Sequence, residues 1–187
     1  FAGWLEENGL EPNGYYLAVG RFVPENNYET MIREFMASGT DRAFALVTGV
    51  DEGFLDELEK RTGFRSDPRI RFVGTVYDQE LLKKIRENAF AYLHGHEVGG
   101  TNPSLLEALA STRLSLLLDV GFNREVAEGA ALYWTKEAGS LIRLIMRVES
   151  VDDQEANVFR ELSREMIRVR YSWNLVVSSY EKLFLEN

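Results

Sequence analysis

The chain has 187 residues, of which 45% are hydrophobic and 27% charged, values ordinary for a soluble globular domain. Its net charge of −9 leaves no basic field to attract nucleic acid or a broad anionic membrane surface. The absence of cysteine excludes disulfides and thiolate metal sites, and no apolar run approaches the roughly 20 residues of a membrane span. No signal peptide is visible, so we expect a cytoplasmic protein. Because the chain begins with Phe1, we expect a piece of a longer protein.

Short apolar runs alternate with longer amphipathic segments along the chain. The expected strands are residues 15–19, 43–48, 70–73, 89–93, 114–118 and 131–134. The expected helices are residues 25–38, 53–61, 78–88, a segment from 103, a short one near 123–128, and most of the chain after about 137. This alternation predicts an α/β fold: a single domain, residues 1–187, with a Rossmann-like parallel sheet of about six strands and helices on both faces. In such sheets the ligand lies outside the carboxyl ends of the strands.

The most informative segment is residues 94–110, HGHEVGGTNPSLLEALA. The pair Gly99 and Gly100 leads into a helix start, with Asn102 as the expected cap and a proline at the first helical position. Flexible backbone beside a helix N-terminus can present N–H groups to an anionic ligand. Glu107, inside the same helix, adds a carboxylate, so the segment suits a ligand that carries both phosphates and hydroxyls.

A second anion-binding residue follows the first expected strand. Gly20 ends that strand, and Arg21 comes next in the sequence GRFVPENN. The planar, permanently charged guanidinium matches the geometry of a diphosphate. A surface arginine without a ligand is the alternative, and the residues alone leave it open.

The two histidines of the chain, His94 and His96, lie at the end of the fourth expected strand and are followed by Glu97. Imidazole and carboxylate could together bind zinc or iron. No separate cluster supplies further ligands, so we expect no metal. The remaining interpretations are that a histidine hydrogen-bonds the ligand, or that one is buried and bonded to backbone.

These motifs resemble those of the retaining glycosyltransferases of family 4, which have the GT-B fold. The wording HGH-x-VGGTNPSLLEA is most similar to bacterial rhamnosyltransferases that build surface polysaccharides. Matching blocks run from about residue 12 to 185 in the family's order. The resemblance implies that the chain is the C-terminal, donor-binding half of a GT-B enzyme, and that the acceptor site lies in an absent N-terminal half.

The resemblance also implies roles for individual residues. Donor-binding residues would be Gly20, Arg21, Gly74, Tyr77, His96, Gly99, Gly100, Thr101, Asn102 and Glu107. Gly74 and Tyr77 would hold the nucleobase, Glu107 the ribose, and Arg21 with the amides of 99–102 the diphosphate. Arg21 and Glu107 are the expected catalytic residues, and no cofactor beyond the donor is expected.

Three departures from the family pattern concern the same site. Asn26 stands where the family has a lysine, so one expected cation is missing. The first of two family glutamates falls on Gly99; either Glu97 bulges round to replace it, or the glycine amides do so, which we favour. Arg124 is a candidate second cation, or else a structural arginine paired with Glu125 or Glu128.

The implied activity is transfer of a hexose, most simply rhamnose from dTDP-rhamnose, to a lipid-linked or polysaccharide acceptor, at the inner face of the membrane. The isolated half is expected to be inactive. A GT-B nucleotide-sugar epimerase and a non-catalytic nucleotide-binding Rossmann-type domain are the alternatives. The sequence Gly20-Arg21-Phe22-Val23-Pro24-Glu25 lacks a dinucleotide fingerprint, which argues against NAD or FAD. Residues 168–184 have the helical spacing of the last GT-B helix or of an ordinary core helix.

Overall fold

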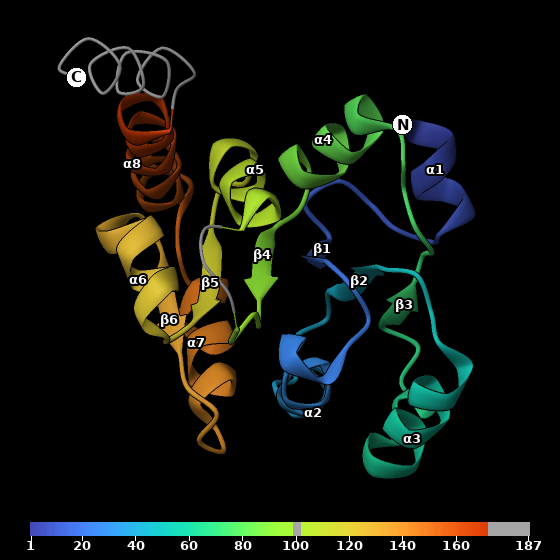
Figure 1. Ribbon diagram of the computed structural model, residues 1–187. Coiled ribbons are helices and arrows are strands. Elements are labelled where there is room, and N and C mark those ends of the chain that lie inside the picture. The colour runs from blue at the N-terminus through green and yellow to red at the C-terminus, as the bar shows by residue number, and fades with distance from the viewer. Residues whose placement is uncertain (99–101, 172–187) are drawn as a thin grey trace, which may run out of the picture.

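The computed structural model describes residues 1–98 and 102–171 (Figure 1). In this part of the chain, six strands form one sheet in the order β3-β2-β1-β4-β5-β6, and every neighbouring pair is parallel. The strands are β1 (Tyr15–Val19), β2 (Ala43–Val47), β3 (Ile70–Phe72), β4 (Ala91–His94), β5 (Ser115–Leu118) and β6 (Leu132–Trp134). The predicted parallel α/β sheet is therefore confirmed.

Helices connect the strands and cover both faces of the sheet. They are α1 (Ala2–Glu7), α2 (Tyr28–Ala37), α3 (Glu52–Thr62), α4 (Gln79–Glu87), α5 (Pro103–Ser111), α6 (Gly121–Ala127), α7 (Ser140–Glu149) and α8 (Asp153–Arg170). Short 3-10 turns occupy Pro24–Asn26, Phe64–Ser66 and Glu128–Ala130. One face packs against α2, α3 and α7, and the other against α1, α4 and α5, as Figure 1 shows with the first group below the sheet and the second above it.

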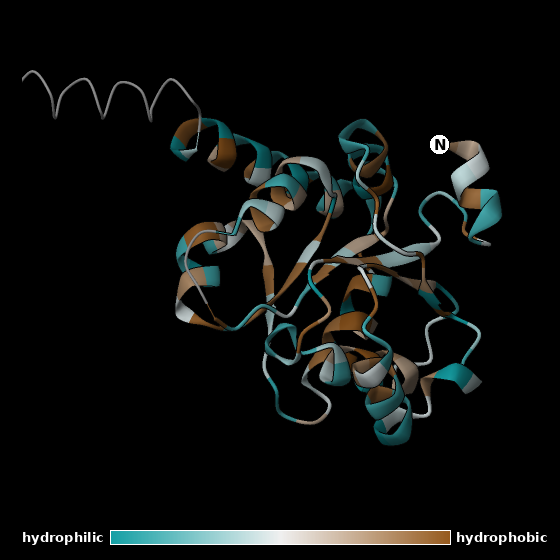
Figure 2. Cartoon of the chain, turned by 45° about the vertical axis from the view of Figure 1, so that its right-hand side comes forward, coloured by the Kyte–Doolittle hydropathy of each residue, from teal (hydrophilic) through white to brown (hydrophobic). Residues whose placement is uncertain are grey.

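The alternation of side chains along β1 illustrates how the strands supply both cores. Tyr16 and Ala18 point into the core beneath α2, whereas Tyr15 and Leu17 point into the core beneath α1 and α4. Because both faces are buried, the strand is apolar throughout, without the alternation of a half-exposed strand. Figure 2 shows the hydrophobic residues gathered along the strands and on the inner sides of the helices.

Several predicted boundaries need correction. Helix α1 was not expected, and the helix expected over 25–38 is a 3-10 turn and then α2, because Asn27 has a left-handed φ of 55° that interrupts the ladder. Strand β4 starts at Ala91 rather than residue 89, and α6 starts at Gly121 rather than near 123. Of the helix expected over 168–184, residues up to 170 belong to α8, and the part from 172 lies outside the described residues.

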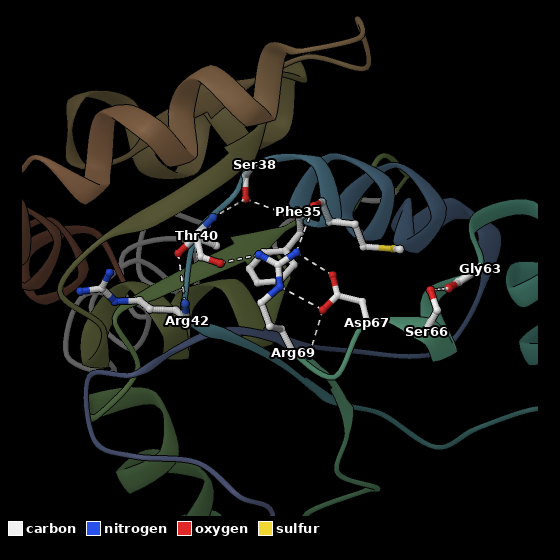
Figure 3. A network of polar contacts seen from close by, with 9 residues as sticks. Phe35, Ser38, Thr40, Arg42, Gly63, Ser66, Asp67 and Arg69 are labelled. Atoms are coloured by element: carbon white, nitrogen blue, oxygen red, sulfur yellow. Dashed lines mark hydrogen bonds and ion pairs between the residues drawn. The ribbon is translucent and has the colours of Figure 1, made fainter.

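An arginine network stabilises the sheet edge where the strands begin (Figure 3). Arg69 pairs with Asp67 at 2.6 Å, and it donates to the backbone oxygens of Met36, at 3.0 Å, and Thr40. The guanidinium thereby satisfies carbonyls at and beyond the end of α2, which have no partner within the helix. This network lies at the amino ends of the strands, opposite the carboxyl ends where a ligand is expected.

The order of the strands defines one special point at their carboxyl ends. The chain proceeds outward from β1 through β2 to β3, and then returns to β4 on the other side of β1. The connections after β1 and β4 therefore leave the sheet in opposite directions and open a crevice between them, which is where ligands bind in open α/β sheets.

Candidate functional site

The candidate site lies between the loop after β1, residues 20–27, and the described part of the segment after β4, residues 95–98. Asn27 joins the two loops: its Nδ2 donates to the Gly95 carbonyl at 2.8 Å and to Glu97 Oε2 at 2.7 Å. The backbone N–H of Glu97 also donates to the Glu25 carbonyl, at 3.2 Å. The left-handed φ of Asn27, tolerated by asparagine, aims its side chain across the gap. The crevice thus has a floor of two loops held together by hydrogen bonds.

Gly95 allows this close approach because it has no side chain. A Cβ at this position would lie 2.3 Å from the Asn26 carbonyl oxygen, well inside van der Waals contact. Asn26 is itself buried, and its Nδ2 donates to the Arg21 carbonyl at 2.7 Å. The residue at the family's lysine position therefore closes the β1–α2 loop instead of facing a ligand.

The two histidines form a stacked pair, with ring centroids 5.4 Å apart and an angle of 13° between the rings. His94 is only 3% exposed, and its Nε2 has no hydrogen-bond partner among the described residues. Burial, aided by the neighbouring His96, lowers the pKa of His94 to about 3. Burial and then the charge of Arg21 lower the pKa of His96. Both imidazoles are therefore neutral at pH 7 and can donate or accept hydrogen bonds.

A cavity of about 10 Å³ lies beside His94 and is lined also by Asn26, Tyr28 and His96. This volume suits a single water molecule. The prediction that one histidine is buried is correct, but its side chain forms no hydrogen bond to backbone within residues 1–98 and 102–171. The carbonyl of His96 accepts a hydrogen bond from Asn123 Nδ2 at 3.1 Å, and the same amide also donates to Leu118, so α6 anchors the loop from its other side.

Arg21 is an exposed cation at the carboxyl end of β1. Within the described part of the chain no carboxylate lies within ion-pairing distance of it. The preceding Gly20 is fixed on both sides: its N–H donates to the Val47 carbonyl at 3.3 Å and its carbonyl accepts from Tyr28 Oη at 3.2 Å. An anchored backbone with an unpaired guanidinium is suited to binding a phosphate.

The start of α5 forms as predicted, with Asn102 as its cap and Pro103 in the first turn. Asn102 Oδ1 accepts from the Ser104 N–H at 2.9 Å, and the Asn102 carbonyl accepts from Leu105 and Leu106. These amides are therefore occupied by the cap, and an anion here depends on the helix dipole and on the N–H groups that precede the helix. The predicted ligands Gly99, Gly100 and Thr101 lie outside the described residues.

Glu107 lies on α5 with its side chain 48% exposed, and its Oε2 is 2.7 Å from Arg86 Nη2. The arginine comes from α4, and its side chain is only 3% exposed. The buried guanidinium thus holds one oxygen of a carboxylate that is otherwise half-exposed to solvent. A half-exposed acceptor in this arrangement can bind ligand hydroxyls.

The loop after β3 contains Gly74 and Tyr77, the residues expected to hold the nucleobase. Gly74 has a φ of 74°, a turn conformation that favours glycine, and Tyr77 is 86% exposed. Asp78 caps α4 as predicted, accepting from the N–H groups of Glu80 and Leu81 at 3.0 and 3.1 Å. Stacking of a nucleobase on the exposed phenol ring of Tyr77 remains a prediction.

Glu97 and Arg124 both form ion pairs that the sequence did not indicate. Glu97 Oε2 pairs with Lys136, from the loop after β6, as well as with Asn27, and these contacts lower the pKa of the carboxyl, with Lys136 the larger cause. Arg124 pairs with Asp119, at 2.7 Å for Nη2–Oδ2, and stacks on Tyr133 at 4.2 Å. The expected partners of Arg124, Glu125 and Glu128, are thus replaced by a residue on the preceding loop.

Within residues 1–98 and 102–171, no group of three metal-ligating side chains comes together. No helix in the described ranges is long and apolar enough to cross a bilayer.

Comparison with solved structures identifies the architecture. The chain aligns with a glycosyltransferase from Rickettsia africae ESF-5 at a TM-score of 0.85 and 14% identity, covering 99% of this chain and 51% of that one. It aligns with sucrose-phosphate synthase from Thermosynechococcus elongatus at 0.79 and 20% identity, covering 100% and 50%. The fold is that of one half of a GT-B glycosyltransferase.

A third GT-B structure carries ligands. Anabaena HepE in complex with UDP and glucose aligns at a TM-score of 0.84 and 14% identity, over 99% of this chain and 52% of that one. The chain therefore spans about half the length of these GT-B proteins. The sequence matches no protein-family model and no curated protein.

Sequence reasoning missed the residues that hold the site together: Arg86, Asn27, Asn123 and Lys136. A signal existed for Arg86, which lies four residues after Leu82 and next to Ile85 on the apolar side of a predicted helix. A charged residue on the buried face of a helix requires a partner. Asn27 and Lys136 had no comparable signal. Both contact Glu97, which is 70 residues from Asn27 and 39 residues from Lys136 in the sequence.

Proposed function

We propose that this chain is the donor-binding half of a glycosyltransferase and that it binds a nucleoside-diphosphate sugar in the crevice between β1 and β4. The observation that carries the proposal is the placement of Arg21 and Glu107. A guanidinium with no carboxylate partner among residues 1–98 and 102–171 follows β1, and an anchored, half-exposed carboxylate lies on the helix after β4. The UDP and glucose in HepE, a protein of the same fold, support this choice of ligand.

The roles of the residues follow from their chemistry. Arg21 and the N-terminal end of α5 would stabilise the negative charge that develops on the nucleoside diphosphate as the glycosidic bond breaks. Glu107 would accept hydrogen bonds from the ribose hydroxyls, and Tyr77 would stack on the base. His96, neutral and partly exposed, would hydrogen-bond the sugar or a phosphate oxygen. These interactions accelerate transfer where they are stronger in the transition state than in the bound donor.

The finer parts of the proposal concern the whole protein. The sugar would be rhamnose from dTDP-rhamnose, and the acceptor a saccharide or lipid-linked glycan at the inner face of the membrane. The support is the segment HGH-x-VGGTNPSLLEA and its resemblance to surface-polysaccharide rhamnosyltransferases. Residues outside this chain would hold the acceptor, so the 187-residue chain alone would bind donor without transferring sugar.

Calorimetric titration tests the donor-binding role. UDP, dTDP and GDP are titrated into the full-length protein and into the 187-residue chain, with Glu107→Ala as the site variant. Glu155→Ala, an exposed glutamate on α8, is the control. We expect saturable binding of one nucleotide, about tenfold or more weaker in Glu107→Ala and unchanged in the control. Failure of the full-length protein to bind any of the three would refute the proposal.

A further inference from the structure

Arg86 is a buried arginine whose charge is paired with a half-exposed glutamate. It lies near the end of α4, its side chain is 3% exposed, and its one ion-pair partner in the described part of the chain is Glu107. Its Nε has no hydrogen-bond partner among those residues. Removing a guanidinium from water is costly unless it is well paired. An apolar residue would fill this position at lower cost, which indicates that the charge serves Glu107.

The pair is asymmetric in exposure. Arg86 is enclosed, whereas the Glu107 side chain is 48% exposed. A glutamate on a helix surface ordinarily samples several rotamers, and ordering it costs conformational entropy. Contact of Oε2 with a fixed guanidinium selects one orientation in advance. In that orientation Oε1 is not hydrogen-bonded to any described residue and remains available to a ligand.

The guanidinium is itself fixed relative to the carboxyl end of β1. Arg86 Nη2 donates to Ser104 Oγ at 3.4 Å, and Ser104 Oγ donates to the Val19 carbonyl at 3.4 Å. The same carbonyl accepts from Tyr92 Oη at 3.2 Å. One polar cluster therefore joins helices α4 and α5 to strands β1 and β4. Its β1 member, Val19, directly precedes Gly20 and Arg21 in the sequence.

We propose that Arg86 is a positioning residue that orients the Glu107 carboxylate toward the ribose of the bound nucleotide, so that the site selects ligands with a free 3′-hydroxyl. This inference deepens the proposed function and depends on it. The 3′-hydroxyl is the hydroxyl that ribonucleotides and deoxyribonucleotides share. Pre-orientation lowers the entropy that binding must otherwise lose. Arg86 Nη2 makes both contacts, to Glu107 and to Ser104; lysine would keep the charge but would hold it on a flexible stem in place of a rigid, planar guanidinium.

The test compares affinities within each variant. The full-length protein is titrated with UDP and 3′-deoxy-UDP, and with dTDP and 3′-deoxy-dTDP. We expect the wild type to prefer the hydroxylated nucleotide by about tenfold or more. Glu107→Gln and Arg86→Met should each reduce this ratio to about twofold, with Arg86→Lys intermediate. In the double variant Glu107→Gln/Arg86→Met, the second substitution should change the affinity ratio little further, because both substitutions act on one interaction.

A ratio within one variant does not depend on how much protein is folded, so loss of stability cannot imitate the result. Arg113→Met is the matched control, since Arg113 is paired with Asp153 at 2.6 Å before β5, at the opposite edge of the sheet, and it should keep the wild-type ratio. An Arg86→Met protein that retains the full preference overturns the positioning role alone. Absence of nucleotide binding in the wild type overturns the proposed function as well.

Discussion

Asn27 and Gly95, 68 residues apart in the sequence, are joined by a hydrogen bond of 2.8 Å from the Asn27 side chain to the Gly95 carbonyl. The bond connects the loops that follow β1 and β4, the two strands between which the chain reverses direction across the sheet. The crevice between β1 and β4 therefore has a fixed floor. A ligand that spans both loops meets a preformed surface, and less binding free energy is lost in ordering it.

Replacement of Asn27 by glycine should loosen this floor without straining the backbone. Glycine accepts the φ of 55° but loses hydrogen bonds to Glu25, Gly95 and Glu97. We expect a loss of about 1–3 kcal/mol in unfolding free energy by urea titration, and faster amide hydrogen exchange at residues 95–98. Asn27→Ala should lose about 1 kcal/mol more, from its left-handed φ. Unchanged exchange in Asn27→Gly would show that the loops do not depend on this side chain.

A methyl group at residue 95 should force the same loops apart. The added Cβ of Gly95→Ala would lie 2.3 Å from the Asn26 carbonyl oxygen, so the backbone must shift. Such overpacking costs about 1–3 kcal/mol, and thermal unfolding should detect it. Nucleotide affinity should fall in parallel. Gly129→Ala, where nothing lies within 4 Å of the added methyl, is the control and should unfold close to the wild-type temperature.

Arg21→Met should weaken UDP binding but leave uridine binding unchanged, because the guanidinium is assigned to the diphosphate. Loss of a hydrogen bond to a charged group costs about 1.5–3 kcal/mol, or roughly 10- to 150-fold in Kd. The affinity for UDP should also become less sensitive to salt. Arg65→Met, whose guanidinium pairs with Asp56 at 3.1 Å, is the matched control. Equal losses for UDP and uridine would contradict the assignment of Arg21.

His94 should make the protein less stable as the pH falls from 6.5 toward 3. Its pKa is lowered to about 3 in the folded protein by burial, while the unfolded chain has the ordinary value near 6.5. Between these values the unfolded state binds the extra proton, so stability rises with pH, by at most about 1.4 kcal/mol per pH unit. The contribution is complete above about pH 6.5 and is lost as the pH decreases through this range.

The His94 effect is isolated by comparing wild type with His94→Phe in urea unfolding at pH 7.5, 6 and 5. Carboxylates with lowered pKa, such as Asp67 and Glu97, give a slope of the same sign in both proteins, so the difference between the two slopes reports His94. We expect a shallower slope for His94→Phe. Equal slopes would mean that His94 is protonated in the folded protein.

The sequence by itself determined the local elements and their kind. The apolar runs at 15–19, 43–48 and 114–118 contain strands buried on both faces, and the run at 70–73 contains the less buried edge strand β3. Asp78 and Asn102 became helix caps. Hydrophobic runs, caps and proline positions act within a few residues, so a single sequence displays them. The placement of Arg21 after β1 and of Glu107 in α5 followed from the same local patterns.

The tertiary structure alone decided which loops meet and what holds them. Strand order put β1 beside β4, Asn27 against Gly95 and Glu97, and Arg86 beneath Glu107. It also assigned Glu97 to Lys136, and Arg124 to Asp119 in place of the two glutamates expected. Such pairs are formed by the packing of whole helices and loops across the sheet. A polar side chain carries no local mark of its partner, because its hydrogen bonds go to whichever group the fold brings within reach.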